Sequence, residues 1–413
     1  MKNEKDKSSH SVTRVAWQRF RKNRLSMLGL ILILFFIVLA VLGYLITPDS
    51  TPDANQQLLE ISKNPPGFEV QILMFKKNET THYTYFLSKM LFGEISDYRS
   101  IPIISYRFEG ENIFYKEFSG ENKHVDFEKK ICIADVVFAL KESAKNKIKV
   151  KNHEITFYEL EKEQPTTKTI AELQYEIANH NIIRRKFWLG TDPSGRDLLS
   201  RLILGTRVSF SVGFISVFIS LFIGLFIGAI AGYYRGKLDN AIIWIINVVW
   251  SIPTLLLVIA ITLALGKGLW QVFIAVGMTM WVDVARVIRG QVISIREKDF
   301  VEAARALGFS DFRIIFRQIL PNVMGPVIVI SAANFASAIL IEAGLSFLGI
   351  GAQPPTASWG EMINSHREFI MGQSPFLAIL PGVAIVLIVL SFVLLGNGLR
   401  DALDTKMKEQ SVI

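Results

Sequence analysis

The sequence predicts an all-α polytopic membrane protein with six transmembrane helices and an α+β domain inserted on the outer side of the membrane. Half of its 413 residues are apolar, and they are clustered in long runs. A helix needs about 18 to 20 apolar residues to cross roughly 30 Å of hydrocarbon, and several runs are this long. Residues 49–187 are instead too polar for the bilayer and too rich in aromatic and β-branched residues for disorder. We therefore expect a membrane bundle interrupted by one folded segment.

Charge and composition exclude several functional classes. The net charge is +8, and the excess of Lys and Arg flanks the apolar runs without forming a basic patch with interleaved aromatic residues, so nucleic-acid binding is not expected. A single cysteine, Cys132, excludes an intrachain disulfide and a cysteine-based metal site. The six histidines lack metal-ligand spacing, and His180 is expected at a solvated helix end. No metal site is therefore predicted.

The chain begins with a basic segment, residues 1–25, in which Arg14, Arg19 and Arg21 lead into the first apolar run. This run, residues 26–46, is too long for the apolar part of a signal peptide, and no small-residue cleavage site follows it. We expect an uncleaved first transmembrane helix, preceded by a cytoplasmic amino-terminal segment.

Five more apolar runs follow within a predicted five-helix core, residues 188–405. They cover residues 208–232, 241–265, 269–287, 323–348 and 376–396. The short loops expected inside, 233–240 and 288–322, are rich in Lys and Arg, whereas the two short outside loops hold one such residue each, Lys267 and Arg367. The positive-inside rule thus gives the same orientation as the helix count, with both termini and the tail 406–413 in the cytoplasm.

The inserted segment, residues 49–187, carries strand and helix signals. Residues 101–108 and 113–118 predict a hairpin across a polar turn, and residues 148–158 predict a further strand or pair of strands. Residues 134–145 and 169–180 have helical spacing, with Thr167 or Thr169 as the cap of the second helix. Residues 49–66 are expected to be a linker.

The inside loop 288–322 predicts two short helices at the membrane surface. Asp299 and Glu302 have the spacing of a capping box, and Gly308 is suited to the left-handed residue that ends a helix. Ser310 would cap a second amphipathic helix that Pro321 ends. By itself the pattern fits an ordinary connector on the lipid headgroups as well as a dedicated contact surface.

The string EAARALGFSDFRIIFRQILPN in this loop resembles the EAA loop of bacterial ABC-importer permeases, and the predicted fold class is accordingly that of such a permease. The matching residues are Glu302, Ala303, Ala304, Gly308, Leu320 and Pro321, whereas Gln318 stands where the family has an aliphatic residue. The resemblance implies that the loop, together with Asp299, inserts as a coupling helix into an ATPase subunit. Ala303 and Ala304 would then allow close approach, and Gly308 would set the bend.

Other motifs resemble the dipeptide, oligopeptide and nickel branch of the same family. One is LGTDxxGRDxxSR, whose residues are Gly190, Thr191, Asp192, Gly195, Arg196 and Asp197. The others are EAGLSFLGIG, residues 342–351, and the pair Trp359 and Gly360. The resemblance is loose over residues 1–48 and close over 187–405, and it does not cover the inserted domain. From the residues alone, 192–195 form a turn and Asp197 begins a helix, which is a structural role.

Small and polar residues inside the predicted helices give further candidates. Gly224, Gly228 and Gly232 share one helix face and allow a second helix to approach closely, from this chain or from a partner. Glu342 and Asn334 are candidates for a gate or translocation path, although Glu342 could equally serve helix-to-helix hydrogen bonding. Asp283 is expected to pair with Arg286 on its own helix.

The resemblance implies a transport subunit and no catalytic residue. The chain has no phosphate-binding loop of the GxxxxGK[ST] type, so ATP and Mg²⁺ would bind to partner subunits, and no cofactor is expected on this chain. The implied partners are two ATPase subunits, a homologous permease in a heterodimer, an extracytoplasmic substrate-binding protein, a peptide substrate and the lipid of a bacterial cytoplasmic membrane.

Two alternatives remain open at this point. One is a non-importing ABC membrane subunit, for export or mechanotransmission, in which a large outer domain also follows the first span. The other is an importer of nickel chelates or other small solutes.

Overall fold

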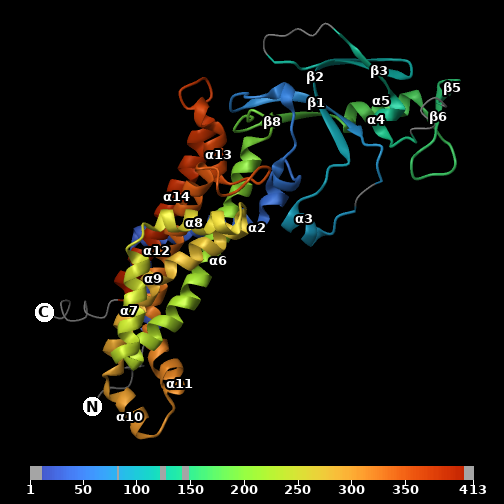
Figure 1. Cartoon of the computed structure of the whole chain (residues 1–413). Coiled ribbons are helices and arrows are strands. Elements are labelled where there is room, and N and C mark those ends of the chain that lie inside the picture. The colour runs from blue at the N-terminus through green and yellow to red at the C-terminus, as the bar shows by residue number, and fades with distance from the viewer. Residues whose placement is uncertain (1–11, 81–82, 121–126, 142–147, 404–413) are drawn as a thin grey trace, which may run out of the picture. The chain divides into compact units, whose positions relative to one another are not determined.

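The structure is a computed structural model that describes residues 12–80, 83–120, 127–141 and 148–403. Two compact units can be distinguished, a helical unit formed by residues 1–40 and 205–413 and a mixed unit formed by residues 41–204 (Figure 1). Their boundaries fall inside helices α2 (Arg24–Ile46) and α6 (Leu198–Tyr234). The predicted tail 406–413 and the first residues of the basic segment 1–25 lie outside the described residues.

Long apolar helices make up the helical unit. Five candidate spans are long and apolar enough to cross a membrane, and a bent pair of helices gives a sixth if it is counted as one span. Besides α2 and α6, the helices are α1 (Val12–Lys22), α7 (Gly236–Trp250), α8 (Thr254–Leu265), α9 (Leu269–Arg296), α10 (Asp299–Ala306), α11 (Asp311–Ile314), α12 (Leu320–Phe347), α13 (Trp359–His366) and α14 (Phe376–Leu403). Figure 1 shows α10 and α11 at one end of these helices and α13 at the other.

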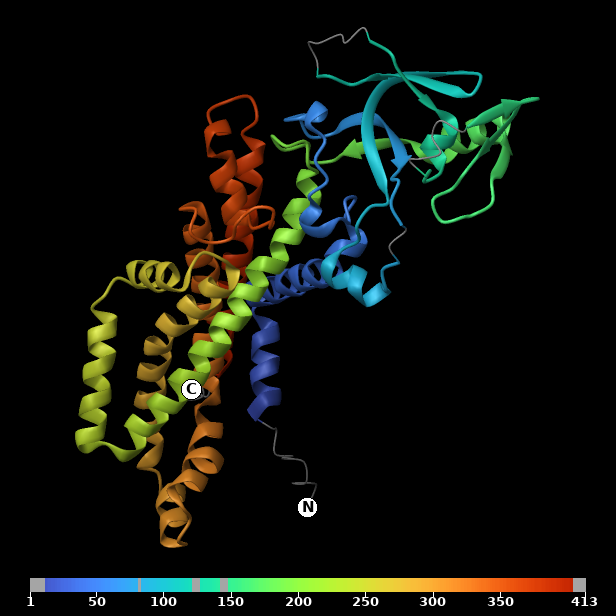
Figure 2. The same cartoon turned by 45° about the vertical axis from the view of Figure 1, so that its right-hand side comes forward.

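The predicted continuous helix 241–265 is wrong, because α7 and α8 are separated by a break and bent by 88° (Figure 2). Pro253 precedes α8 and has no amide hydrogen to donate, so it interrupts the run of helical hydrogen bonds at this point. Asp239 fixes α7 to α9 through a two-pronged ion pair, in which Arg289 Nε and Nη2 donate to its two carboxylate oxygens at 2.6 and 2.7 Å. The ion pair therefore fixes the start of α7, while the bend itself lies at residues 251–253.

The glycine face of α6 packs against α9 of the same chain. A Cβ placed on Gly224 would lie 2.5 Å from the Val284 side chain, and one on Gly228 would lie 2.6 Å from the Ala285 carbonyl oxygen. A Cβ on Gly232 would lie 2.8 Å from the carbonyl oxygen of Arg289. The spacing allowed a contact with a helix of this chain or with a helix of a partner, and in the structure these glycines pack against a helix of this chain.

The mixed unit contains two antiparallel sheets. The first has the strand order β4-β3-β2-β1-β8, and the second has the order β5-β6-β7. The strands are β1 (Phe68–Lys76), β2 (Tyr98–Glu109), β3 (Asn112–Glu117), β4 (Lys129–Cys132), β5 (Lys149–Lys151), β6 (Glu154–Phe157), β7 (Thr166–Thr169) and β8 (Ile182–Phe187). Its short helices are η1 (Pro52–Ala54), η2 (Leu59–Ile61), α3 (Phe86–Phe92), α4 (Ile133–Val137), α5 (Ile170–Glu176) and the π-turn η4 (Ile177–Asn181).

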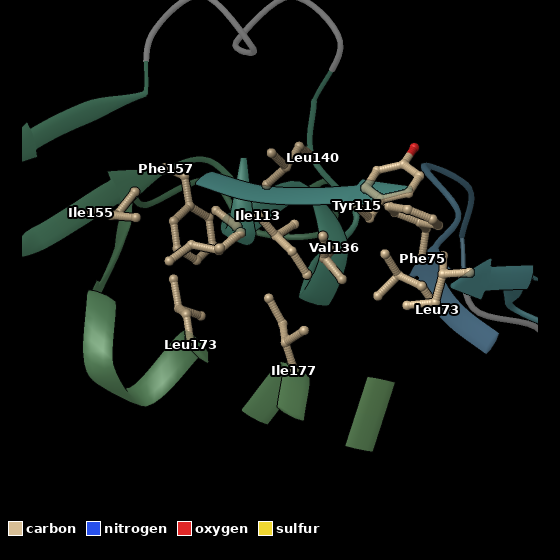
Figure 3. Packing of buried hydrophobic residues seen from close by; sticks show 13 residues of the cluster. Leu73, Phe75, Ile113, Tyr115, Val136, Leu140, Ile155, Phe157, Leu173 and Ile177 are labelled. Carbon is tan, nitrogen blue, oxygen red and sulfur yellow. The ribbon is translucent and has the colours of Figure 1, made fainter. Parts of the chain in front are cut away.

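The core of this unit forms where α5 and η4 cover the strands. Leu173 and Ile177 are fully buried and point toward Ile113, Val136 and Phe157 (Figure 3). Thr169 and Glu172 form a capping box at the start of α5. Of the two predicted caps, Thr167 and Thr169, the structure therefore has Thr169. Cys132 is a half-buried free thiol, and His180 is exposed at the end of η4.

Besides the capped helix, two predictions for this unit are wrong and two more are confirmed. The helix predicted over 134–145 is limited to α4, because the chain becomes extended at Phe138; residues 142–147 lie outside the described residues. The segment 49–66 is not a linker, since it contains η1 and η2 and buries Ala54 and Ile61 completely. The hairpin β2–β3 and the strand pair β5–β6 are present as predicted.

Replacing Gly228 by alanine should reduce the stability of the helical unit. The new methyl group would press on the backbone of α9, and overpacking of this kind costs about 1 to 3 kcal/mol. We expect a lower melting temperature for the detergent-solubilised protein. Gly290→Ala on α9 is the matched control, because a Cβ there has no atom within 4 Å. Equal melting temperatures for the two variants would contradict the close packing of α6 on α9.

Candidate functional site

The loop between α9 and α12 is the first candidate site, and its first helix starts differently from the prediction. Lys298 is the residue that precedes α10, and no side chain caps the helix. The amide of Glu302 donates to the Lys298 carbonyl oxygen at 3.3 Å. The capping box predicted from Asp299 is therefore wrong, because the helix begins one residue earlier and places Asp299 inside its first turn. Both carboxylates still lie near the positive end of the helix dipole, where negative charge is favourable.

The carboxyl end of α10 is a Schellman motif centred on Gly308. This glycine has a φ of +75°, and its amide donates to the Arg305 carbonyl oxygen at 2.9 Å. The amide of Phe309 donates to the Ala304 carbonyl oxygen at 3.1 Å. These two bonds satisfy the last carbonyl groups of the helix and fix the direction in which the chain leaves it.

One face of α10 is buried and the other is open. Val301 and Ala304 pack into a cluster that also contains Ile295 of α9 and Ile314 of α11. Glu302 and Ala303 are exposed, and the Leu307 side chain is 73% exposed. The EAA string therefore divides between the two faces, with Ala304 as an anchor and Glu302 and Ala303 free to contact a partner.

Tyr233 at the end of α6 connects this loop to the long helices. Its hydroxyl donates to Asp311 Oδ1 at 2.6 Å, and its carbonyl oxygen accepts from Arg296 of α9. The Arg305 guanidinium of α10 lies 5.2 Å from the centre of its ring. The ends of α6 and α9 are thereby joined to α10 and α11 by charge-assisted hydrogen bonds and a cation–π contact. Sequence reasoning missed Tyr233, because only the folded chain brings it to the loop.

The second helix of the loop does not end at Pro321. Ser310 precedes α11 without a side-chain hydrogen bond, and the π-turn η5 (Ile315–Ile319) carries α11 directly into α12. Pro321 is tolerated because it lies in the first turn of α12, where a missing amide hydrogen costs little. Leu320 packs against the same apolar cluster as α10. The loop is thus continuous with a long membrane helix.

The motif LGTDxxGRD forms a second site, which is built around the buried carboxylate of Asp192. Its Oδ1 accepts from the amides of Ser194 and Arg196 at 2.8 and 2.9 Å, and its Oδ2 accepts from Arg196 Nε at 2.6 Å. The fully buried Arg201 lies 3.9 Å from the same oxygen. Arg201 also donates to the Asp53 carbonyl oxygen at 3.3 Å. Asp192 therefore organises both its own turn and a contact to the segment 49–66.

The neighbouring motif residues hold that segment in place. Thr191 Oγ1 accepts from the Asn64 amide at 2.9 Å, and Ser200 Oγ accepts from the Asp49 amide at 3.0 Å. Gly195 has a φ of +71°, and a side chain there would overlap the Leu58 carbonyl group. Gly190 accepts from the Leu198 amide at 3.2 Å. We call residues 49–66 with 190–201 the clamp; its partners Asp49 and Asn64 carry no sequence signal of their own.

Asp197 of the clamp begins α6 by accepting from the Ser200 amide at 3.0 Å and from the Ser200 hydroxyl. Burial raises the pKa of its carboxyl group above the ordinary value, while the hydrogen bonds from Ser200 oppose that shift. The structural role that the residues alone suggested for this motif thus has a physical basis in the clamp.

Glu342 lies in a hydrogen-bonded network at one end of α12. Its Oε1 accepts from the hydroxyl groups of Ser346 and Ser358, each at 2.7 Å. Gly360 allows α13 to contact this network, since a Cβ there would lie 2.6 Å from the Ala343 carbonyl oxygen. Trp359 is buried and packs against Phe36. These contacts give residues of both strings a structural role and support hydrogen bonding by Glu342 Oε1, while Glu342 Oε2 has no hydrogen-bond partner among the described residues.

Asn334 instead lines a polar pocket of about 350 Å³ between α9, α12 and the broken pair α7 and α8. Asp283 lines the same pocket, and its predicted ion pair with Arg286 is not formed. The Arg286 guanidinium lies over the Trp250 ring, 4.4 Å from its centre. Among the described residues, no group of three or more His, Cys, Asp or Glu side chains could hold a metal ion.

Comparison with known proteins relates this chain to a family of membrane transport proteins. The family model of the binding-protein-dependent transport system inner membrane component matches residues 224–409. A model of the N-terminal transmembrane domain of oligopeptide transport permease C matches residues 11–66. Neither range includes residues 67–223, which contain most of the mixed unit.

Curated relatives of known name are similar over about half of the chain. The dipeptide transport system permease protein DppC of Alkalihalophilus pseudofirmus is 44% identical, over 54% of this chain and 72% of the relative. The glutathione transport system permease protein GsiD of Pectobacterium atrosepticum is 42% identical, over 54% of this chain and 73% of the relative. A solved structure of the MetNI methionine ABC transporter, in an inward-facing conformation, has a TM-score of 0.43 and 20% identity, over 50% of this chain and 98% of that one.

Replacing Asp192 by asparagine should open the clamp. The change removes the buried carboxylate that pairs with Arg196 and lies beside Arg201, and breaking a buried pair costs about 3 to 5 kcal/mol. We expect faster proteolysis between residues 49 and 66, measured by limited digestion and mass spectrometry. Asp97→Asn is the matched control, because its partner Lys76 is partly exposed and such pairs contribute about 0 to 1 kcal/mol. Equal cleavage of the two variants would contradict the clamp.

Proposed function

This chain belongs to the family of binding-protein-dependent transport system inner membrane components, and we propose that its loop between α9 and α12 couples separate ATPase subunits to a transmembrane path for peptides. It is a permease subunit of an ABC transporter and not an enzyme. It is a multi-pass inner membrane protein that works with ATPase and binding-protein partners. A non-importing ABC subunit fits less well, given the named relatives.

The open face of α10 is the observation that carries the coupling proposal. It presents Glu302, Ala303 and Leu307 to solvent, while Ala304 and the Tyr233 contacts fasten the same helix to α6, α9 and α11. An exposed leucine beside a small residue is suited to a close apolar contact with another protein. Because α11 continues into α12 through η5, a push on α10 would move a membrane helix with little loss in the loop.

The rest of the assembly follows from the same proposal. Two ATPase subunits would bind ATP and Mg²⁺, and a second, related permease would complete a heterodimer. The loop and both termini would face the cytoplasm, as the Lys and Arg of the short inside loops suggest. The mixed unit would then be an extracytoplasmic α+β domain that follows the first span and precedes the five-helix core. Peptides are the proposed substrate, because the named relatives transport dipeptides and glutathione.

Replacing Gly308 by proline should abolish ATP-driven peptide uptake while leaving membrane insertion intact. Proline fixes φ near −65°, whereas Gly308 has a φ of +75° and donates its amide to Arg305. The Schellman motif at the end of α10 could therefore not form, and the chain would leave the helix in a different direction. Gly308→Asn is the matched control, because asparagine tolerates the left-handed conformation. Uptake of a labelled tripeptide into membrane vesicles is the measurement, and an unchanged rate for Gly308→Pro would refute the coupling role.

Replacing Leu307 by aspartate should weaken the contact with the ATPase subunits. The side chain is 73% exposed, so the change should leave the fold of this chain intact while placing a charge in the proposed interface. We expect less ATPase to co-purify with the variant than with the unchanged chain. Met371→Asp is the control, since this side chain is 98% exposed in the connection between α13 and α14, and α13 lies at the other end of the helices from α10. Equal losses for both variants would argue against a specific interface.

A further inference from the structure

The polar pocket lined by Asp283 and Asn334 lies near the middle of the long helices. Asp283 belongs to α9 and Asn334 to α12, and each helix has 28 residues. At about 1.5 Å per residue, both side chains start roughly halfway along helices of about 42 Å. The pocket is also lined by neutral polar residues, Thr254, Thr279 and Ser337. Polar groups at this depth are costly unless they face water, a partner or a passing solute.

Asn334 has an unmet donor in this pocket. Its side chain is 5% exposed, and its Nδ2 has no hydrogen-bond partner among the described residues. A buried amide normally finds a partner, because leaving it unpaired forfeits the hydrogen bonds it makes to water in the unfolded chain. An unpaired donor that lines a pocket is therefore placed to bind an acceptor that enters it.

Asp283 supplies the negative charge of the pocket. It is the one charged residue among the described residues that line it. Its side chain is exposed and lines the pocket, and the ion pairs found among the described residues do not include it; Arg286, three residues further on, lies over the Trp250 ring. An ionised carboxylate at membrane depth attracts a cation or a hydrogen-bond donor.

The break between α7 and α8 completes the pocket. Residues 249–254 on either side of the break contribute Trp250, Ile252 and Pro253 to its wall. Irregular backbone at membrane depth is tolerated where it lines a cavity that water or a solute can enter. The bend, the unpaired amide and the unpaired carboxylate thus meet at one place, which none of the recognised motifs includes.

We propose that Asp283 and Asn334 form a subsite for the amino-terminal end of a peptide in transit. The Asp283 carboxylate pairs with the α-ammonium group, and the Asn334 amide donates to a carbonyl oxygen of the peptide. A metal ion is a poorer fit, because one carboxylate and one amide provide too few ligands for a divalent cation. This inference rests on the proposed peptide permease and names which part of the substrate the chain contacts.

Thiol labelling tests the subsite without relying on transport. In the complete transporter reconstituted in proteoliposomes, Cys132→Ser removes the native thiol and Ser337→Cys places one in the pocket wall. A cationic methanethiosulfonate should react there several-fold faster than a neutral one, after correction for their rates with a free thiol. Adding Asp283→Asn should remove that preference, whereas adding Asn247→Ala, outside the pocket, should keep it. Equal rates for both reagents with Asp283 present would overturn the proposal.

Peptide protection and uptake then test the ligand. Trialanine should slow the labelling of Ser337→Cys, and N-acetyl-trialanine, which lacks the ammonium group, should slow it less. Asp283→Asn and Asn334→Ala should each reduce ATP-driven trialanine uptake by about tenfold, the loss expected for one charge-assisted or buried hydrogen bond, while Asn247→Ala should not. Asp283→Glu should restore part of the labelling preference.

The outcomes separate the two proposals. If the unchanged complex takes up trialanine and Asp283→Asn alters neither labelling nor uptake, the subsite is wrong and the permease function stands. Equal protection by the free and acetylated peptides would also overturn the subsite. If Gly308→Pro transports as fast as the unchanged chain, the coupling function fails, whatever the labelling shows.

Discussion

Hydrocarbon contains no hydrogen-bonding groups. Each polar group of the helical unit that lies inside the membrane therefore needs a partner within the protein or in a cavity. The long helices meet this demand through their own hydrogen bonds. Glu342, at one end of α12, meets it at its Oε1, which accepts from two serine hydroxyl groups, while its Oε2 has no hydrogen-bond partner among the described residues. The break between α7 and α8 meets it at a pocket wall. The same requirement thus fixes both the packing of the unit and the position of its polar pocket.

Rigidity is a second consequence of close packing. The three glycines of α6 let α9 approach at backbone distance, and Tyr233 joins the ends of both helices to α10 and α11. Packed interiors transmit displacement instead of absorbing it. The coupling contact that we propose at α10 and the pocket halfway along α9 and α12 are therefore connected by closely packed helices.

Much of this architecture could be predicted from the sequence, because apolar length and turn chemistry are local signals. The spans, the glycine face, the hairpin β2–β3 and the left-handed Gly308 all follow from residue type and spacing. The errors occur where tertiary structure determines whether a helix breaks or a segment is ordered. Pro253 breaks a run that hydropathy alone shows as continuous, and Pro321 does not break one because it falls in a first turn. The segment 49–66 has a linker composition, yet Arg201, Thr191 and Ser200 hold it by hydrogen bonds that no local sequence pattern predicts.

The pairing of β1 with β8 brings the entrance and the exit of the mixed unit together. Phe68 is opposite Phe187, so the chain leaves the first sheet beside the point where it entered. The residues between them form a segment whose two ends are held together. For a flexible segment of this kind, each doubling of its length costs only about 0.6 kcal/mol of closure entropy. A domain whose two ends lie side by side can be inserted into a chain while the flanking segments stay close together, which is consistent with a domain that the family models leave uncovered beside segments that they match.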